Sequence, residues 1–180
     1  MSRLIGIAGR AGSGKDTAGA HLVERYGFQQ YAFADPIRAM LGALGAFPAA
    51  DLINRDTKEV VIDWLGKSPR QMAQTLGTEW GRELVHPQLW VLMAQRRWDA
   101  AKAEGQSLVI TDVRFENEVE WIKAQGGHVI VLERPGVEAV SAHASEQFNP
   151  ADLADWFIRN DNTIDILLHR VDEAVTELNP

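Results

Sequence analysis

A glycine-rich loop between an apolar strand and a helix constrains the fold of this chain more than any other feature. Residues 9–15 read G-R-A-G-S-G-K, follow the apolar run 4–8 and precede a helical pattern over 15–26. Glycines let successive backbone N–H groups turn inward around an anion, and the positive end of the following helix points at the same anion. The spacing therefore predicts a phosphate-binding loop. A glycine-rich turn with an exposed lysine is the alternative, but it leaves the agreement of strand, spacing, lysine and helix unexplained.

The residues of this loop and of the first helical turn are the candidate ATP-binding residues. Lys15 supplies a mobile positive charge for the β- and γ-phosphates. Asp16 stands where a Ser or Thr hydroxyl usually reaches Mg²⁺, and Thr17 follows it. Asp16 either holds a water molecule bound to magnesium or is an acid favourably placed in the first turn of the helix. The full expected set is Gly9, Ala11, Gly12, Ser13, Gly14, Lys15, Asp16 and Thr17.

A second carboxylate follows another apolar run, residues 108–111, which ends at Asp112. At the carboxyl end of a central parallel strand, an aspartate lies beside the phosphate loop and can orient magnesium or its waters. A strand followed by aspartate is common, so Asp112 indicates a magnesium site only because the chain also has the phosphate loop 9–15. Arg114 either reaches the transferred phosphoryl group or forms a surface ion pair with Glu116 or Glu118.

Short apolar strands alternate with longer amphipathic helices, which predicts an α/β fold with a parallel sheet. The length of 180 residues and the ordinary share of hydrophobic residues, 46%, fit a single ordered domain over 1–180. Residues 36–104 form a long, mostly helical segment between the second and third strands, which a simple βαβ unit does not need. The expected strands are 3–8, 28–34, 107–111, 128–133 and 156–159, and the other expected helices are 15–26, 115–125 and 164–178.

Charge and cysteine content exclude several classes of protein. The formal net charge is −7, from 18 basic and 25 acidic residues, which argues against a protein that follows a nucleic-acid backbone. The chain has no cysteine, which excludes disulfides, thiolate metal sites and cysteine nucleophiles. The run 4–8 is too short for a signal sequence, and no apolar stretch approaches the ~20 residues that span a bilayer. We therefore expect a cytoplasmic protein without membrane or nucleic-acid partners.

Arg134 directly follows the expected strand 128–133. Phosphoryl transfer depends mostly on positioning and charge neutralisation, so it needs an arginine that closes over the phosphates. We assign that role to Arg134 and expect residues 134–148 to form a lid that excludes water. The lid segment carries His143, Ser145 and Glu146, and we assign no catalytic role to His143.

A polar helix from residue 68 to 82 carries the candidate acceptor site. On an α-helix Arg70 and Gln74 share a face, with Arg82 near it. Two guanidinium groups can hold an acceptor phosphate by bidentate bonds, while Gln74 and Glu79 can contact polar edges of a base or sugar. The alternative is an exposed amphipathic helix with solvated charges.

Several of these segments occur together in one order that resembles the deoxynucleoside monophosphate kinases of phages and prophages. The resemblance covers residues 4–162, and R-Q-M-A-Q-T-L-G-T-E-W-G-R is its most distinctive part, whereas the phosphate loop is shared with many unrelated ATPases. The segments are 9–17, A-D-P-I-R at 34–38, residues 68–82, T-D-V-R-F at 111–115, G-G at 126–127 and E-R-P at 133–135.

The resemblance implies a three-layer P-loop kinase fold whose five-stranded parallel sheet has the order 2-3-1-4-5. It implies that residues 36–104 are a helical acceptor-binding module and that magnesium is held largely through water and substrate oxygens, including the waters of Asp16 and Asp112. Asp35 and Arg38 join the acceptor site, although Asp35 can equally be only the N-cap of a helix that begins with Pro36.

The implied reaction is the transfer of a phosphoryl group from ATP·Mg²⁺ to a deoxynucleoside monophosphate, giving the diphosphate and ADP. Arg114 and Arg134 then neutralise the transferred group, and Lys15 bridges the phosphates of ATP. Three arginines hold the acceptor phosphate: Arg38, Arg70 and Arg82. A phage-encoded enzyme of this kind works in the host cytoplasm, and a homodimer is an open expectation.

Two other functions remain open at this point. A kinase of the same fold can act on phosphomevalonate or dephospho-coenzyme A, and a nucleotide-binding switch or nucleic-acid ATPase uses the same loop. Six tryptophans are many for this length. Trp80 and Trp90 lie where they can stack on a base, and the others are expected in the core. Those four are Trp64, Trp98, Trp121 and Trp156.

Overall fold

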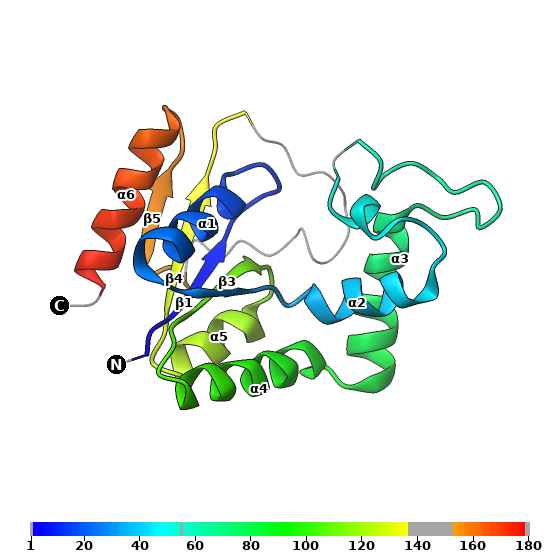
Figure 1. Ribbon diagram of the computed structural model, residues 1–180, viewed down its shortest axis with the longest axis horizontal. Helices are drawn as coiled ribbons and strands as arrows, with labels where there is room; N and C mark the ends of the chain where they lie inside the picture. Colours follow the sequence, from blue (N-terminus) through cyan, green and yellow to red (C-terminus); the bar gives the residue numbers. More distant parts are fainter. Residues whose placement is uncertain (1, 55, 137–152, 179–180) are drawn as a thin grey trace. The chain divides into compact units, whose positions relative to one another are not determined.

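The computed structural model describes residues 2–54, 56–136 and 153–178, and within them five strands form one sheet (Figure 1). All neighbouring strands pair in parallel, in the order β2-β3-β1-β4-β5. This arrangement confirms the predicted α/β fold and strand order. The strands are β1 (Leu4–Ala8), β2 (Gln29–Tyr31), β3 (Leu108–Val113), β4 (His128–Glu133) and β5 (Trp156–Arg159).

The helices depart from expectation mainly between α2 and α3. There the chain forms a short 3₁₀ helix, turns and a bridge between Ile62 and Lys67, where the sequence predicted mostly helix. No helix within the described ranges is both long and apolar enough to cross a membrane. The helices are α1 (Lys15–Tyr26), α2 (Asp35–Leu44), the 3₁₀ helix η1 (Ala49–Leu52), α3 (Pro69–Thr75), the π-helix η2 (Leu76–Val85), α4 (Leu89–Ala103), α5 (Glu116–Ala124) and α6 (Ile164–Glu177).

Contacts divide the chain into two compact units, which are described separately below. The first comprises residues 1–32 and 94–180 and contains the whole sheet. The second comprises residues 33–93, with α2, η1, α3, η2 and the start of α4. It overlaps most of the segment 36–104 that was predicted to bind the acceptor, and that role stays a prediction.

The sheet of the first unit is covered on both faces, so its central strands are continuous apolar runs. All five residues of β1 are buried. Ile5 and Ile7 pack with Leu22 of α1 and Val171 of α6, whereas a Cβ at Gly6 would meet Ile122 of α5. Successive residues of a strand point to opposite faces, so α1 and α6 cover one side and α5 the other. This is the predicted three-layer architecture.

The tryptophans divide between core and surface. Trp98 is 2% exposed, and Trp156 packs against the main apolar cluster, as expected. Trp64, expected in the core, is 71% exposed, so that prediction is wrong. The cause is local: Trp64 lies in the turn closed by the Ile62–Lys67 bridge, where the expected helix does not form.

Asp172 on α6 joins that helix to α1 through hydrogen bonds and a nearby positive charge. Its carboxylate accepts hydrogen bonds from His21 Nε2 at 2.7 Å and the Tyr26 hydroxyl at 2.8 Å, and lies 3.4 Å from Arg25 Nε. Burial raises the pKa of the Asp172 carboxyl, but the hydrogen bonds from His21 and Tyr26 and the nearby charges outweigh burial, so the pKa lies below its ordinary value of 3.8.

Asp172→Asn is expected to lower the free energy of unfolding at pH 7 by about 2 kcal/mol, because hydrogen bonds to a charged acceptor are lost. A carboxyl whose pKa is lowered on folding binds fewer protons in the folded chain. Its contribution is therefore complete above the ordinary value of 3.8 and is lost as the pH falls through the lower folded value. Urea unfolding at pH 7 and pH 3 measures the difference between the two proteins, which should shrink at pH 3.

The matched control is Glu173→Gln on the same helix, which alters an exposed contact between Glu173 Oε1 and His169 Nε2 at 3.4 Å, an ion pair only when the histidine is protonated. Exposed pairs contribute about 0.5 kcal/mol, so this variant should unfold almost as the parent protein does. A difference for Asp172→Asn that persists undiminished at pH 3 would show that packing, and not the ionised carboxylate, joins the two helices.

Candidate functional site

The predicted phosphate loop has a backbone that only glycine adopts without strain. Gly9, Gly12 and Gly14 have φ angles of +138°, +86° and +107°. A Cβ at Gly9 would collide with the Leu132 carbonyl oxygen of β4 and would lie 2.8 Å from Ser13 Oγ. Here glycine is required both by the left-handed conformation and by the close approach of the loop to β4.

Lys15 folds back over the loop that precedes it. Its ammonium group donates hydrogen bonds to the carbonyl oxygens of Gly9 at 2.6 Å and Arg10 at 2.8 Å, and the residue is 8% exposed. The helix N-cap is Gly14, which has no side chain to bond the first-turn N–H groups. Ser13 Oγ is buried without a hydrogen-bond partner among the described atoms. Orphaned donors and a buried ammonium group at one helix end fit a bound phosphate.

Asn160, which sequence reasoning missed, joins this loop to the carboxyl ends of β5 and β4. Its side-chain Nδ2 donates to the Ser13 carbonyl oxygen at 2.9 Å, and its backbone N–H donates to the Glu133 carbonyl oxygen at 2.6 Å. A Cβ at Gly14 would lie 2.8 Å from the same Nδ2. The one available signal was its position directly after β5, because the carboxyl ends of parallel strands meet at one edge of a sheet.

Asp112 lies at the edge of the sheet where the loop begins. Its neighbour Val113 on β3 pairs with Ala8, the last residue of β1. The other neighbour, Thr111, contacts α1 at Gly19, one turn after Lys15, and a Cβ at Gly19 would overlap the threonine methyl. The first turn of α1 therefore lies over the carboxyl end of β3. The magnesium role of Asp112 at this end of β3 stays a prediction.

Arg114 is positioned by a buried glutamate. Glu118 is 2% exposed, and its Oε2 accepts hydrogen bonds from the backbone N–H groups of Arg114 at 2.7 Å and Phe115 at 3.1 Å. Sequence reasoning treated Glu118 only as an ion-pair alternative for Arg114. The signal for its actual contact was its place as the third residue of α5, where a glutamate reaches back to the N-cap N–H.

Arg134 directly follows β4 and is exposed. Of the expected lid over 134–148, only residues 134–136 are among those described. His143, Ser145 and Glu146 lie outside the described residues. The lid and the closing role of Arg134 stay predictions.

The carboxylates of the first unit fit a magnesium ion held through water. Asp16 is exposed on the first turn of α1, and Asp112 is partly exposed at the end of β3. Among the described residues no three His, Asp or Glu side chains gather into a metal site. Mg²⁺ keeps several waters and is usually bound by one or two carboxylates together with substrate phosphates. Two carboxylates at a phosphate loop match that pattern.

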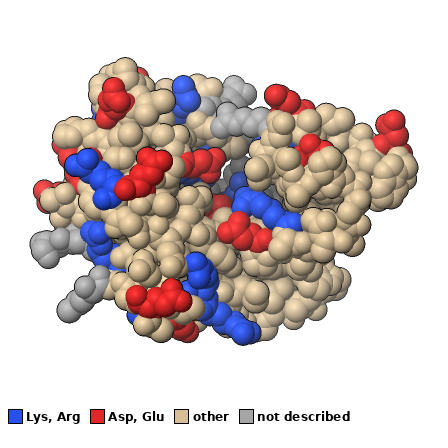
Figure 2. All heavy atoms as spheres, in the orientation of Figure 1, with Lys and Arg blue, Asp and Glu red and all other residues tan. Residues whose placement is uncertain are grey.

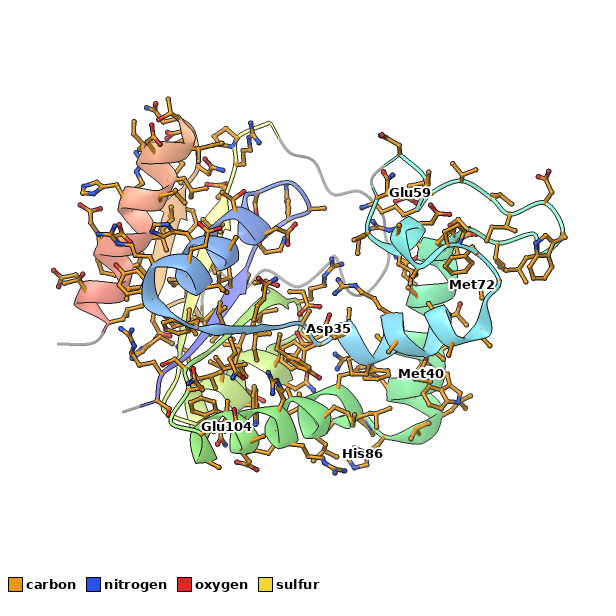
Figure 3. The ribbon with its side chains drawn as sticks, in the orientation of Figure 1. Asp35, Met40, Glu59, Met72, His86 and Glu104 are labelled. Atoms are coloured by element: carbon orange, nitrogen blue, oxygen red, sulfur yellow. The ribbon has the colours of Figure 1, made fainter. Side chains whose placement is uncertain are left out.

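In the second unit Asp35 and Arg38 pair with each other. Arg38 Nη1 lies 2.8 Å from Asp35 Oδ1 on the first turn of α2, where Figure 3 labels Asp35. Asp35 is the first helical residue and Ala34 is the N-cap, so the expectation that Asp35 caps this helix is wrong by one position. An acid in the first turn is favoured by the helix dipole, and here it also orients Arg38.

Arg70 lies at the start of α3, whose N-terminus is closed by a capping box between Ser68 and Gln71. The Arg70 side chain is 13% exposed, and its Nη1 lies 3.2 Å from Glu59 Oε1. The helix α3 continues directly into η2, and we call residues 69–85 the acceptor rod. On this rod Gln74 and Arg82 are partly buried and Glu79 is exposed. The four residues lie on α3 and on the π-helix η2 that continues it, and their acceptor role stays a prediction.

Trp90 has a structural role in this unit. It is 3% exposed, and its Nε1–H donates a 2.7 Å hydrogen bond to the Gly77 carbonyl oxygen. The expectation that Trp90 stacks on a base is therefore wrong, because both ring and donor are already occupied. Trp80 is 37% exposed, and its stacking role stays a prediction.

Comparison with known proteins shows which family this chain belongs to. A model of the deoxynucleotide monophosphate kinase family matches residues 49–171. The chain belongs to this family. The match begins after the phosphate loop and includes residues 70–82, so it rests on the part of the chain that unrelated ATPases do not share. Membership confirms the expected family and the expected enzyme class, a nucleoside monophosphate kinase that phosphorylates deoxynucleotides.

Two viral relatives and one solved structure illustrate the likeness. A protein of Acanthamoeba polyphaga mimivirus, named for the same kinase, is 33% identical over 179 residues, 90% of each chain. The deoxynucleoside-5′-monophosphate kinase of Escherichia phage T5 is 43% identical over 68 residues, 38% of this chain and 26% of that protein. The dephospho-CoA kinase of Campylobacter jejuni has a TM-score of 0.53 at 16% identity, covering 98% of this chain and 97% of that one, which shows a shared fold alone.

Proposed function

We propose that this chain transfers the γ-phosphoryl group of ATP to the phosphate of a deoxynucleoside monophosphate through the residues described above. The observation that carries the proposal is the loop 9–15, whose glycines and Lys15 form an anion site at the start of α1. Family membership supports a deoxynucleotide as the acceptor. The donor site and the acceptor residues fall in different units of the chain.

On the donor side, the loop N–H groups and Lys15 hold the phosphates of ATP. Asp112 and Asp16 would hold a magnesium ion through water, and such an ion would supply positive charge for the β- and γ-phosphates. Arg114, oriented by Glu118, and Arg134 neutralise the transferred phosphoryl group. A general base is not required, because the acceptor phosphate is already an anion and attacks the γ-phosphorus itself.

On the acceptor side, Arg38, Arg70 and Arg82 hold the monophosphate. Asp35 orients Arg38, and the polar side chains of Gln74 and Glu79 contact the base or sugar. Carboxylate and phosphate oxygens offer an arginine the same bidentate geometry. Glu59 therefore stands in for the acceptor phosphate at Arg70, and the two anions compete for one guanidinium group.

The test of the reaction is an ADP-release assay with ATP, Mg²⁺ and each common deoxynucleoside and nucleoside monophosphate in turn. ADP formation that depends on a deoxynucleotide, with the matching diphosphate seen by chromatography, is the expected result. If no nucleotide stimulates ADP release but dephospho-coenzyme A or phosphomevalonate does, the acceptor assignment is wrong. ATP hydrolysis stimulated by nucleic acid alone would indicate an ATPase.

Light scattering of the same protein tests the expected homodimer.

Removing the Arg70 guanidinium group should weaken acceptor binding and spare ATP binding. Arg70→Ala is expected to raise KM for the deoxynucleotide by about 10- to 100-fold, the usual loss for a charged phosphate contact. Glu59→Gln should act in the opposite direction and lower the same KM a few-fold, because it removes the competing carboxylate. Steady-state kinetics with each substrate varied in turn separates the two KM values.

The control for both variants is Arg96→Ala, which removes an exposed arginine from α4. It should leave both KM values within about twofold, as expected of a surface charge. Equal changes in the KM for ATP and for the deoxynucleotide in Arg70→Ala would contradict the acceptor role.

A further inference from the structure

The helix over residues 69–85, which carries the proposed acceptor residues Arg70 and Arg82, changes from α-helix to π-helix in the middle. Residues 69–75 are α-helical, and Leu76–Val85 continue as a π-helix without a break, since Thr75 and Leu76 both have right-handed helical angles. The backbone N–H of His86 bonds to the Gly81 carbonyl oxygen at 3.0 Å, five residues back. Ten residues of π-helix are unusual, because π geometry normally appears as single-turn bulges.

This change of form alters which side chains share a face. An α-helix turns through ~100° per residue, so the expectation that Arg82 lies near the face of Arg70 on an α-helix is wrong, because twelve residues place it about 120° away. A π-helix, with i→i+5 bonds, turns through roughly 80° per residue. Over the six steps from Leu76 to Arg82 this removes on the order of 120° of rotation. The π-helix thus brings Arg82 almost into line with Arg70.

The burial pattern agrees with this alignment. The Arg70 side chain is 13% exposed, and Arg82 is also partly buried. Their neighbours Glu79 and Glu83 are exposed. Two arginines on one side of a rod are suited to hold one anionic ligand, whereas arginines 120° apart are not.

Trp90, from the start of α4, packs against the π-helix within the same unit. The outer ring atom Cζ2 of Trp90 lies where a Cβ of residue 81 would be, so the contact requires Gly81. The Nε1–H of Trp90 donates to the Gly77 carbonyl oxygen at 2.7 Å. A Cβ at Gly77 would lie 2.9 Å from Ile37 Cδ1 of α2. The two glycines let the π-helix fit between Trp90 and α2.

We propose that Trp90 is a positioning residue for the acceptor site. By packing on Gly81 and bonding to Gly77, it holds residues 76–85 in π form and so places Arg82 on the face of Arg70, toward one bound nucleotide. The inference rests on the proposed function, because it assigns Trp90 an effect on the acceptor that acts through Arg82.

The test is Trp90→Phe, assayed with each substrate varied in turn. Phenylalanine lacks both the Nε1–H and the outer ring atom Cζ2 that lies over Gly81. KM for the deoxynucleotide should rise about 5- to 20-fold, while KM for ATP and kcat stay within about twofold. The matched control is Trp98→Phe on the same helix: Trp98 is 2% exposed, and its Nε1 has no hydrogen-bond partner among the described atoms. That variant should change thermal stability without separating the two KM values.

A double variant distinguishes positioning from a general loss of structure. If Trp90 acts through Arg82, then Trp90→Phe should change KM for the deoxynucleotide by less than about twofold once Arg82→Ala is present. Multiplicative effects in the double variant would overturn the positioning role and leave the acceptor role of Arg82 intact. No effect of Arg82→Ala by itself would instead contradict the proposed acceptor site, and the inference with it.

Gly81→Ala supplies a second route should Trp90→Phe fail to fold, as judged by circular dichroism. The added Cβ pushes against the Trp90 ring without changing the ring itself. The same selective rise in KM for the deoxynucleotide is expected. A folded Gly81→Ala enzyme with an unchanged KM would refute the proposal.

Discussion

Lys15→Ala is expected to lower kcat by about 100- to 1000-fold. The ammonium group is the positive charge that the loop presents to the β- and γ-phosphates, and removal of one such group from a pre-organised site costs on the order of 10²–10³ in rate. Loss of its hydrogen bonds to the Gly9 and Arg10 carbonyl oxygens should lower the free energy of unfolding by only about 1 kcal/mol. The coupled ADP-release assay and urea unfolding measure these two effects.

Lys102→Ala is the control, because Lys102 is an exposed lysine on α4 that lies over the Trp98 ring. It should retain full turnover. Retained turnover in Lys15→Ala would contradict the assignment of residues 9–15 as the ATP site. A folded but inactive protein would support the assignment.

Gly9→Ala is expected to have the largest effect on stability. At a φ of +138° an alanine is strained, and its Cβ would also collide with the Leu132 carbonyl oxygen, an atom of the β4 backbone that cannot move freely. Backbone strain of about 1–3 kcal/mol and overpacking of a similar size together predict a loss of roughly 4 kcal/mol. Because the loop must move to relieve the collision, ATP binding should be lost as well.

The matched control, Gly27→Ala, separates strain from collision. Gly27 ends α1 with a φ of +71°, and nothing lies within 4 Å of a Cβ built there. Alanine at this position should cost only about 1–2 kcal/mol of left-handed strain and leave kcat and both KM values unchanged. Thermal unfolding and ATP titration of the two variants provide the comparison. Equal losses of stability would show that φ alone, and not contact with β4, requires glycine at position 9.

Local sequence signals predicted most of the sheet unit. The expected strands 128–133 and 156–159 and the expected helix 15–26 have the bounds found in the structure. Each is an apolar run or amphipathic repeat bounded by glycine or polar residues, so its form depends mainly on near neighbours. Acidic and basic side chains are interspersed over the visible face of this unit, as the mixed composition suggests (Figure 2).

Contacts between distant residues decided what the sequence could not show. Glu118 and Asn160 look ordinary in the sequence, yet Glu118 accepts a hydrogen bond from the backbone N–H of Arg114, and Asn160 joins Ser13 to the end of β4. Periodicity also assumed a uniform α-helix over 68–82, whereas Trp90 packs on Gly81 and the rod becomes a π-helix.

Hydrophobic patterns and motifs along the chain therefore predicted the strands of the sheet unit and the identity of the charged groups, because these patterns depend on near neighbours. The family and the strand order were implied by the resemblance to known kinases. How the charged groups are oriented depends on contacts that form only in the folded chain. Periodicity along residues 68–82 does not predict the π form, whereas the packing of Trp90 on Gly81 and its hydrogen bond to Gly77 form only when α4 lies against this helix.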